Sequence, residues 1–277
     1  MPQELIHLNT RRVVIRLLLL VLLIAACVWS YFVVRWYIGN TLAEYFDPAG
    51  NNLQVAEMAA SLAPDDPLTH WRLGQVTLKS LPLDQQAKAI EQFEKAVSLS
   101  PNDYRFWMAL GTASEQAGDR VKAEQALRRA VELAPHYAYP HWYLGNLLLR
   151  DGRYDEAFVE LRRASEADAE LQVQQFNLIW EVYKTDPAAL KAAVGDNATS
   201  RAKFGLYLLG RQEFEAGLWM WDTLSREEKR SNKESGEAIV GNLLTAWRYH
   251  DAVRVWNDIT LVSNFRVEIG QMLDGSF

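Results

Sequence analysis

The chain is poor in the residues that build cross-linked or extended scaffolds. It has one cysteine, Cys27, among 277 residues, so paired disulfides and Cys-based zinc sites are both excluded. Glycine and proline number only 15 and 9, which excludes a collagen-like or a Pro/Gly-rich disordered chain. The five histidines lack metal-binding spacing, and nucleotide-binding and hydrolase motifs are missing. We therefore expect no metal, no cofactor and no enzymatic activity.

The charge balance argues against nucleic acid as a partner. The formal net charge is -6, and a nucleic-acid-binding protein needs a basic surface instead. This average conceals two unlike regions. Residues 1–40 hold four arginines and one glutamate, whereas the rest of the chain holds 25 basic and 34 acidic side chains. A short basic N-terminal region thus precedes a long acidic one.

Residues 17–34 read LLLLVLLIAACVWSYFVV, an uncharged run between Arg16 and Arg35. As a helix this run is about 27 Å long at about 1.5 Å per residue, close to the thickness of a bilayer's hydrocarbon core. Aromatic residues such as Trp29 and Trp36 gather at its far end, as in an interfacial belt. We predict a transmembrane anchor over residues 13–38 that contacts the lipid bilayer.

The flanking arginines predict the orientation of this anchor. Arg11, Arg12 and Arg16 precede the apolar run and only Arg35 follows closely, so the positive-inside rule places residues 1–12 in the cytoplasm. In a bacterium, the protein would be a single-pass inner-membrane protein with its main part in the periplasm. Ile24 to Cys27 resembles a lipobox, so lipidation of Cys27 is the alternative to an uncleaved anchor.

Two sets of markers recur along the chain after the anchor. Gly74, Gly111 and Gly145 each close a Trp-containing segment, and they are 37 and 34 residues apart. Three prolines that follow apolar-periodic runs have the same two spacings; they are Pro64, Pro101 and Pro135. Independent markers with equal spacing indicate an internal repeat, in which each repeat is one small structural element that cannot bury its apolar face alone.

These repeats resemble the tetratricopeptide repeat (TPR) family, whose period is 34 residues. The middle repeat matches best, with Trp107, Leu110, Gly111, Ala123 and Pro135 at the characteristic places. The resemblance implies an all-α fold in which each repeat is a pair of antiparallel helices and the pairs stack into an α-solenoid. The small residues would allow the two helices of a pair to approach closely.

The repeat signal predicts the order of the remaining parts. Residues 39–66 would be a linker with one helix of a partial repeat, 67–169 three TPR units, and 170–260 degenerate TPR-like helical hairpins. Residues 261–277 change to a strand-like pattern and form a short irregular tail, which is the start of a further domain if the natural chain continues. The predicted fold is thus a transmembrane helix followed by an α-solenoid that degenerates toward its C-terminus.

The TPR resemblance also implies a binding groove, lined by the first helix of each pair. The groove positions stand six and three residues before each repeat glycine, and one, four and five residues after it. They predict a partner-binding groove for a protein or peptide that consists of Leu68, Trp71, Gln75, Leu78, Arg105, Met108, Thr112, Glu115, Tyr139, Trp142, Asn146, Leu149 and Arg150. Its aromatic and apolar content suits an amphipathic helix or an extended peptide.

Trp71 and Trp142 allow two interpretations. They line the groove if the register given above holds. Alternatively, each is the consensus tryptophan of its repeat, displaced by one residue and packed in the core. Methionine fills gaps in either setting, so Met108 does not discriminate between the two.

The leading hypothesis is a membrane-anchored TPR scaffold that binds partner proteins outside the cytoplasm, in cell-envelope or exopolysaccharide assembly. The envelope role comes from a general resemblance to bacterial membrane TPR proteins of polysaccharide clusters. One alternative is a cytoplasm-facing TPR adaptor for membrane enzymes. Another is the stalk of a longer protein whose C-terminal domain binds carbohydrate or is catalytic.

Overall fold

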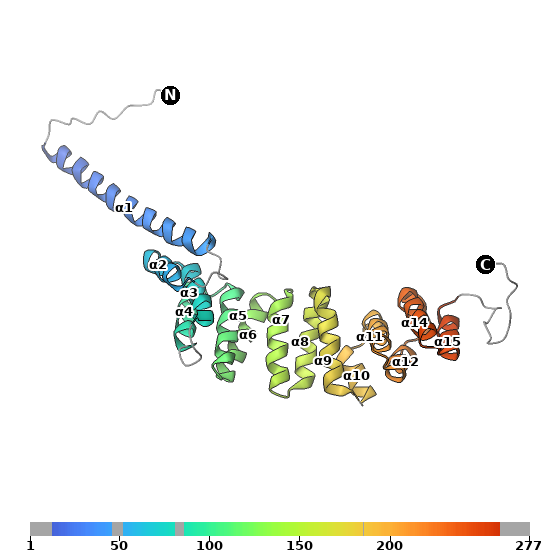
Figure 1. Ribbon diagram of the computed structural model, residues 1–277. Coiled ribbons are helices and arrows are strands. Elements are labelled where there is room, and N and C mark those ends of the chain that lie inside the picture. Colours follow the sequence, from blue (N-terminus) through green and yellow to red (C-terminus); the bar gives the residue numbers. More distant parts are fainter. Residues whose placement is uncertain (1–12, 46–51, 81–85, 185, 261–277) are drawn as a thin grey trace, which may run out of the picture. The chain divides into compact units, whose positions relative to one another are not determined.

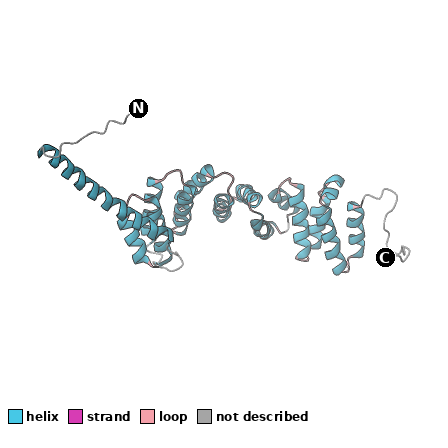
Figure 2. Cartoon of the chain, turned by 90° about the horizontal axis from the view of Figure 1, so that it is seen from above, coloured by secondary structure: helices cyan, strands magenta, loops and turns pink. Residues whose placement is uncertain are grey.

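The computed structural model describes residues 13–45, 52–80, 86–184 and 186–260, and these ranges are helical with short turns between the helices (Figures 1 and 2). No strand occurs in the described ranges. The predicted all-α fold class is confirmed. The predicted N-terminal tail and the predicted strand-like tail, residues 1–12 and 261–277, lie outside the described residues.

The chain divides after Ala134 into two compact halves, each with its own helices. The first half contains α1 (Val13–Tyr45), α2 (Leu53–Leu62), α3 (Pro67–Ser80), α4 (Gln86–Leu99), α5 (Tyr104–Gln116) and α6 (Arg120–Leu133). The second half contains α7 (Ala138–Arg150), α8 (Tyr154–Ala167), the 3₁₀ turn η3 (Ala169–Leu171), α9 (Gln172–Tyr183), α10 (Pro187–Val194), α11 (Ala198–Gly210), α12 (Phe214–Asp222), α13 (Arg226–Ser231), α14 (Lys233–Thr245) and α15 (Tyr249–Ile259).

Short polar signals set the ends of these helices. The side chains of Asp103 and Asp119 accept hydrogen bonds from backbone N–H groups in the first turns of α5 and α6, which otherwise lack partners. Gly118 and Gly152 follow the first helices of their pairs with φ of +85° and +76°. Glycine adopts this left-handed conformation at little cost, so the chain reverses sharply into the second helix of each pair.

The two helices of a pair touch where the first helix has a repeat glycine. A Cβ atom added to Gly111 would lie 2.6 Å from Leu127 Cγ, and one added to Gly145 would lie 2.7 Å from Leu161 Cγ. Both leucines are fully buried. Glycine is therefore required because the second helix places a large apolar side chain directly against the backbone of the first.

The apolar helix α1 continues beyond the predicted anchor and ends at Tyr45. Its mean hydropathy reaches 2.8 over an 18-residue window that is 0% buried, so α1 is long and apolar enough to cross a membrane. Its last turns pack against α2 and α3 (Figure 1). The helix predicted for the partial repeat, α2, therefore pairs with the end of α1.

The second half continues the pattern of helix pairs beyond the recognisable repeats. Gly205 in α11 faces Gly217 in α12, where an added Cβ atom on Gly205 would lie 3.1 Å from the Gly217 carbonyl oxygen. Trp221 of α12 is fully buried among residues of α11, α14 and α15. The helices of residues 170–260 thus keep close contacts at glycine after the repeat sequence itself has decayed.

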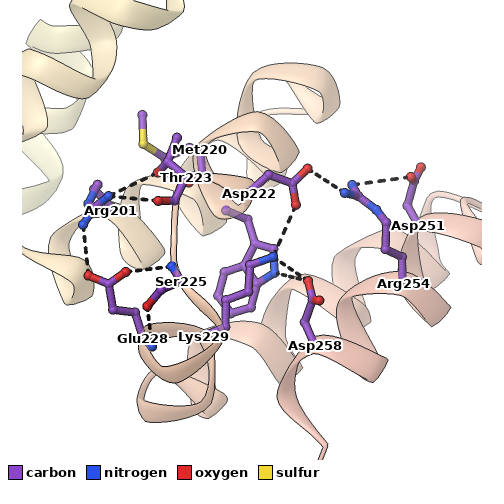
Figure 3. Close-up of polar contacts among 11 residues, drawn as sticks. Arg201, Met220, Asp222, Thr223, Ser225, Glu228, Lys229, Asp251, Arg254 and Asp258 are labelled. Atoms are coloured by element: carbon purple, nitrogen blue, oxygen red, sulfur yellow. Dashed lines mark hydrogen bonds and ion pairs between the residues drawn. The ribbon is translucent and has the colours of Figure 1, made fainter. Parts of the chain in front are cut away.

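An ion-pair network holds the short helix α13 in this half (Figure 3). Arg201 of α11, 7% exposed, donates to Thr223 O and to Glu228 Oε1 at 3.2 Å each. Lys229, 8% exposed, donates to Asp258 Oδ2 of α15 at 2.7 Å. Buried cations need such partners, because removing an unpaired charge from water is costly. The network therefore fixes α13 to α11 and α15.

The glycine contact predicts opposite effects for two Gly→Ala substitutions in helices. Gly111→Ala should lower the free energy of unfolding by about 1–3 kcal/mol, because the new methyl group overlaps Leu127. Gly241→Ala in α14 should raise it by about 0.5–1 kcal/mol, because no atom lies within 4 Å of its added Cβ and alanine favours helix.

Urea unfolding of the detergent-solubilised protein, followed by circular dichroism, measures both changes. Equal effects of the two substitutions would contradict a specific close contact at Gly111.

Candidate peptide-binding site

All thirteen predicted groove residues lie on the first helices of their pairs. Four are in α3, four in α5 and five in α7. Not one of the thirteen is buried, and Arg105, Tyr139 and Arg150 are exposed. In contrast, Val76, Leu110 and Leu144 of the same helices are buried. The predicted residues therefore occupy the accessible faces of these helices.

In the first half, α3 and α5 pack against each other and bring two of the residue sets together. The rings of Trp71 and Phe106 are in contact, with centroids 5.7 Å apart. Guanidinium groups lie near the Trp71 ring, at 4.8 Å for Arg72 and 5.7 Å for Arg105. This arrangement gives α3 and α5 a joint surface that combines an aromatic ring with two cations.

The two cations near Trp71 differ in their partners. Arg105 donates to both carboxylate oxygens of Asp103, and this hydrogen bonding raises the pKa of Arg105 and lowers that of Asp103. Arg72 instead donates to Ala43 O and to Gln75 Oε1, at 3.1 Å each. Burial, and secondly the charge of Arg105, lowers the pKa of Arg72. Among the described residues Arg72 makes no ion pair, so its charge is available to an acidic partner.

Trp71 is half-buried, and it packs against the cluster around Phe93 and Phe106. Its indole N–H is buried and finds no acceptor among the described residues. Trp142 in α7 is also half-buried and packs against Ala138, Ala164 and Leu171. Asn146 Nδ2 donates to Trp142 O at 2.8 Å. Each tryptophan thus contributes one side of its ring to the core and leaves part of its surface accessible.

The place of the consensus tryptophan is occupied by another residue in two repeats. Trp107 Nε1 donates at 2.8 Å to the carbonyl of Pro101, the proline that closes the preceding repeat. His70 Nε2 makes the same bond to Pro64 O at 2.9 Å, and His141 Nε2 to Pro135 O at 3.0 Å. Histidine thus makes this bond one position before Trp71 and Trp142, which favours the groove register for the two tryptophans.

The second ring nitrogen of each histidine faces a different side chain. His70 Nδ1 lies 2.8 Å from Gln92 Oε1, whereas His141 Nδ1 lies 2.5 Å from Glu160 Oε2. A backbone carbonyl and an ionised carboxylate only accept hydrogen bonds, so this arrangement favours the protonated form of His141, which donates from both nitrogens. The hydrogen bond to Glu160 raises the pKa of His141 and outweighs burial, which lowers it.

These interactions were not anticipated from the sequence, although a signal was present. His70, Trp107 and His141 each stand four residues before a repeat glycine and six after a closing proline. In the two repeats that have a histidine at this position, the second helix has a polar residue opposite it: Gln92 faces His70 and Glu160 faces His141. Among the described residues, no group of three or more His, Cys, Asp and Glu side chains is arranged to hold a metal ion.

Comparisons with known proteins agree with the helix-pair architecture. The fold and the recurring glycine contacts define an all-α repeat protein. Residues 85–138 and 114–176 match two family models, both described as tetratricopeptide repeat. Residues 85–176 thus carry tetratricopeptide repeats, and proteins with such repeats mediate protein–protein interaction and scaffolding.

Individual relatives match this chain over part of their length. Superkiller protein 3 of Saccharomyces cerevisiae is 24% identical over 110 residues, which are 40% of this chain and 8% of that protein. Small glutamine-rich tetratricopeptide repeat-containing protein 2 of Mycosarcoma maydis is 27% identical over 124 residues, 45% of this chain and 33% of that protein. The chain thus spans a third or less of these curated relatives.

Among solved structures, that of Pseudomonas aeruginosa pilF aligns with a TM-score of 0.47 and 14% identity, covering 80% of this chain and 96% of that one.

The His141–Glu160 pair predicts that stability falls as pH rises. The pKa of His141 is higher in the folded state, so its stabilisation is complete below the unfolded value of about 6.5 and is lost as pH passes the folded value. Glu160→Gln should remove this decline and lower stability at pH 6 by on the order of 1 kcal/mol.

Urea midpoints measured from pH 6 to pH 9 test this, with Gln92→Glu as the matched variant. That substitution builds the same pair in the first repeat and should steepen the decline. An unchanged pH profile in Glu160→Gln would contradict the assignment.

Proposed function

We propose that the protein is a single-pass scaffold of a bacterial inner membrane, whose TPR repeats bind partner proteins or peptides outside the cytoplasm. The observation that carries this proposal is α1, which joins an exposed apolar surface directly to repeats of a protein-binding family. Large exposed apolar surfaces are rare on soluble proteins and mark contact with lipid or protein.

The composition of α1 supports the membrane as that contact. Its exposed residues from Leu17 to Val34 surround the helix on all sides, so no single protein groove would cover them. Trp29, Phe32 and Tyr37 are exposed toward its C-terminal end, where an interfacial aromatic belt would lie. Uncleaved anchoring is preferred to lipidation of Cys27, because the apolar sequence continues after that residue.

The accessible faces of α3, α5 and α7 support peptide binding. Tryptophan and arginine are the residue types that contribute most to binding at protein interfaces, and Trp71, Arg105 and Trp142 are among the accessible ones. Anchoring by α1 would hold the faces of α3 and α5 near the bilayer and raise the effective concentration of membrane partners. A role in cell-envelope or exopolysaccharide assembly follows from this location and from the resemblance of the layout to bacterial membrane TPR proteins.

Reporter fusions at the C-terminus test the orientation. Alkaline phosphatase fused after Phe277 should be active, and a fluorescent protein that matures only in the cytoplasm should remain dark. A fusion that lacks residues 1–40 serves as the control and should reverse both signals. The opposite pattern in the full-length fusion would favour a cytoplasm-facing adaptor.

Substitution of Met108 tests the binding face independently of the anchor. Met108→Lys should reduce co-purification of specific partners from detergent extracts at least tenfold, because it places a charge on the half-buried face of α5. The thermal unfolding temperature should remain within about 2 °C of the original. Val121→Lys, at a 70% exposed site on α6, is the matched control and should leave binding unchanged.

A large fall in unfolding temperature in Met108→Lys would instead assign Met108 to the core.

A further inference from the structure

The last turns of α1 have the features of a repeat's first helix. A Cβ atom added to Gly39 would lie 2.8 Å from Ala63 Cβ and 2.9 Å from Ala59 O, so α2 touches α1 at a glycine. Gly39 is 35 residues before Gly74, within the range of the repeat spacing. Ala43, one turn later, is 2% exposed. The apolar helix and the repeat array therefore share one helix.

The groove positions also recur on α1. Trp36 stands three residues before Gly39, and Asn40 one residue after it. Trp71 and Gln75 occupy the same places around Gly74, and Trp142 and Asn146 around Gly145. Trp36 is 48% exposed. A tryptophan and a carboxamide thus mark the same two positions on α1, α3 and α7.

Side-chain bonds attach the end of α1 firmly to the next two helices. Asn40 Nδ2 donates to Asp66 Oδ2 at 2.7 Å, and Asp66 in turn accepts from the backbone N–H of Leu68 at the start of α3. Arg72 Nε donates to Ala43 O at 3.1 Å, and Arg35 donates to Ser61 O. With these bonds and the contact at Gly39, α1 cannot rotate freely against α2 and α3.

We propose that the end of α1 is the first wall of the partner-binding surface, and that the partner is a segment directly adjoining a transmembrane helix of another membrane protein. This inference rests on the proposed function, since it requires α1 to span the bilayer. Beyond the proposed function, the inference specifies the class of partner, a membrane protein, and the part of that partner that is bound, the segment next to its transmembrane helix.

The distance from the bilayer supports this choice of partner. The apolar run ends at Val34, and Asn40 follows six residues later, about 9 Å along an unbroken helix. The headgroup layer on each side of a bilayer is about 5–8 Å thick. A segment bound at Trp36 and Asn40 therefore extends from within the headgroup layer to its outer edge, where chain that adjoins a transmembrane helix is already present.

The chemistry of the surface defines the segment further. Trp36 and Trp71 offer partly exposed rings, which suit apolar side chains. Arg72, whose described hydrogen bonds go to a carbonyl and an amide, suits a carboxylate. We therefore infer an apolar segment with at least one acidic residue, located within about ten residues of its own transmembrane helix.

Photo-crosslinking of the full-length protein in its native membrane tests the inference. The crosslinking amino acid p-benzoylphenylalanine replaces Trp36, Trp71 or Tyr37 in separate variants. Tyr37 is the matched control, because it is 64% exposed at nearly the same depth but points about 100° away around the helix. Mass spectrometry then identifies the crosslinked peptides.

The expected result is one membrane protein captured from both Trp36 and Trp71, through peptides within about ten residues of a transmembrane helix, with at least tenfold less from Tyr37. Capture from Trp71 with only lipid at Trp36 would overturn the inference and leave the proposed function intact. The same holds if the captured peptide is remote from any membrane span. Absence of protein crosslinks at both Trp36 and Trp71 would overturn the inference and count against the proposed function.

Gly39→Leu separates the shared helix from the repeats. The new side chain overlaps Ala63 and displaces α1 from α2, so the Trp36 crosslink to the partner should fall at least tenfold. The Trp71 crosslink should persist, which shows that the repeats remain folded. An undiminished Trp36 crosslink in Gly39→Leu would overturn the role of the α1–α2 contact.

Discussion

Close approach of two helices at a glycine is the contact on which the other features of this protein depend. At Gly74, Gly111 and Gly145 the first helix of a pair has no side chain, and a large apolar residue of the second helix fills the space. Burial of Phe93, Leu127 and Leu161 is complete as a result. This packing turns the opposite face of each first helix outward, and the predicted binding residues lie on that face.

The same contact links the apolar helix to the repeats. Gly39 allows α2 to pack on α1, so the helix that meets the membrane in our proposal is also a structural member of the repeat array. Bonds from Asn40 and to Ala43 then secure the junction. An anchor joined in this way can transmit a fixed orientation, whereas a flexible linker would only limit distance.

Much of this architecture was predictable, because glycine and proline report backbone constraints directly. Their common spacing located the helix pairs, and the accessible positions around each glycine followed from the helical period. The roles of His70 and His141 were missed. Histidine differs from tryptophan in size and charge, and the property that they share here is a ring N–H that can donate to the carbonyl of the preceding proline. The groove assignment itself remains a prediction, which the substitutions above are designed to test.

The sequence by itself determined the apolar helix, the repeats and the all-α fold, because each depends on local periodicity and on residues with restricted backbone behaviour. Only the tertiary structure showed that α1 continues to Tyr45 and pairs with α2. It also showed that Glu160 of α8 lies 2.5 Å from His141 Nδ1 and raises the pKa of that histidine. The α1–α2 pairing and the His141–Glu160 contact both join residues that are distant in the chain. The period of a repeat does not specify which side chains meet at such contacts.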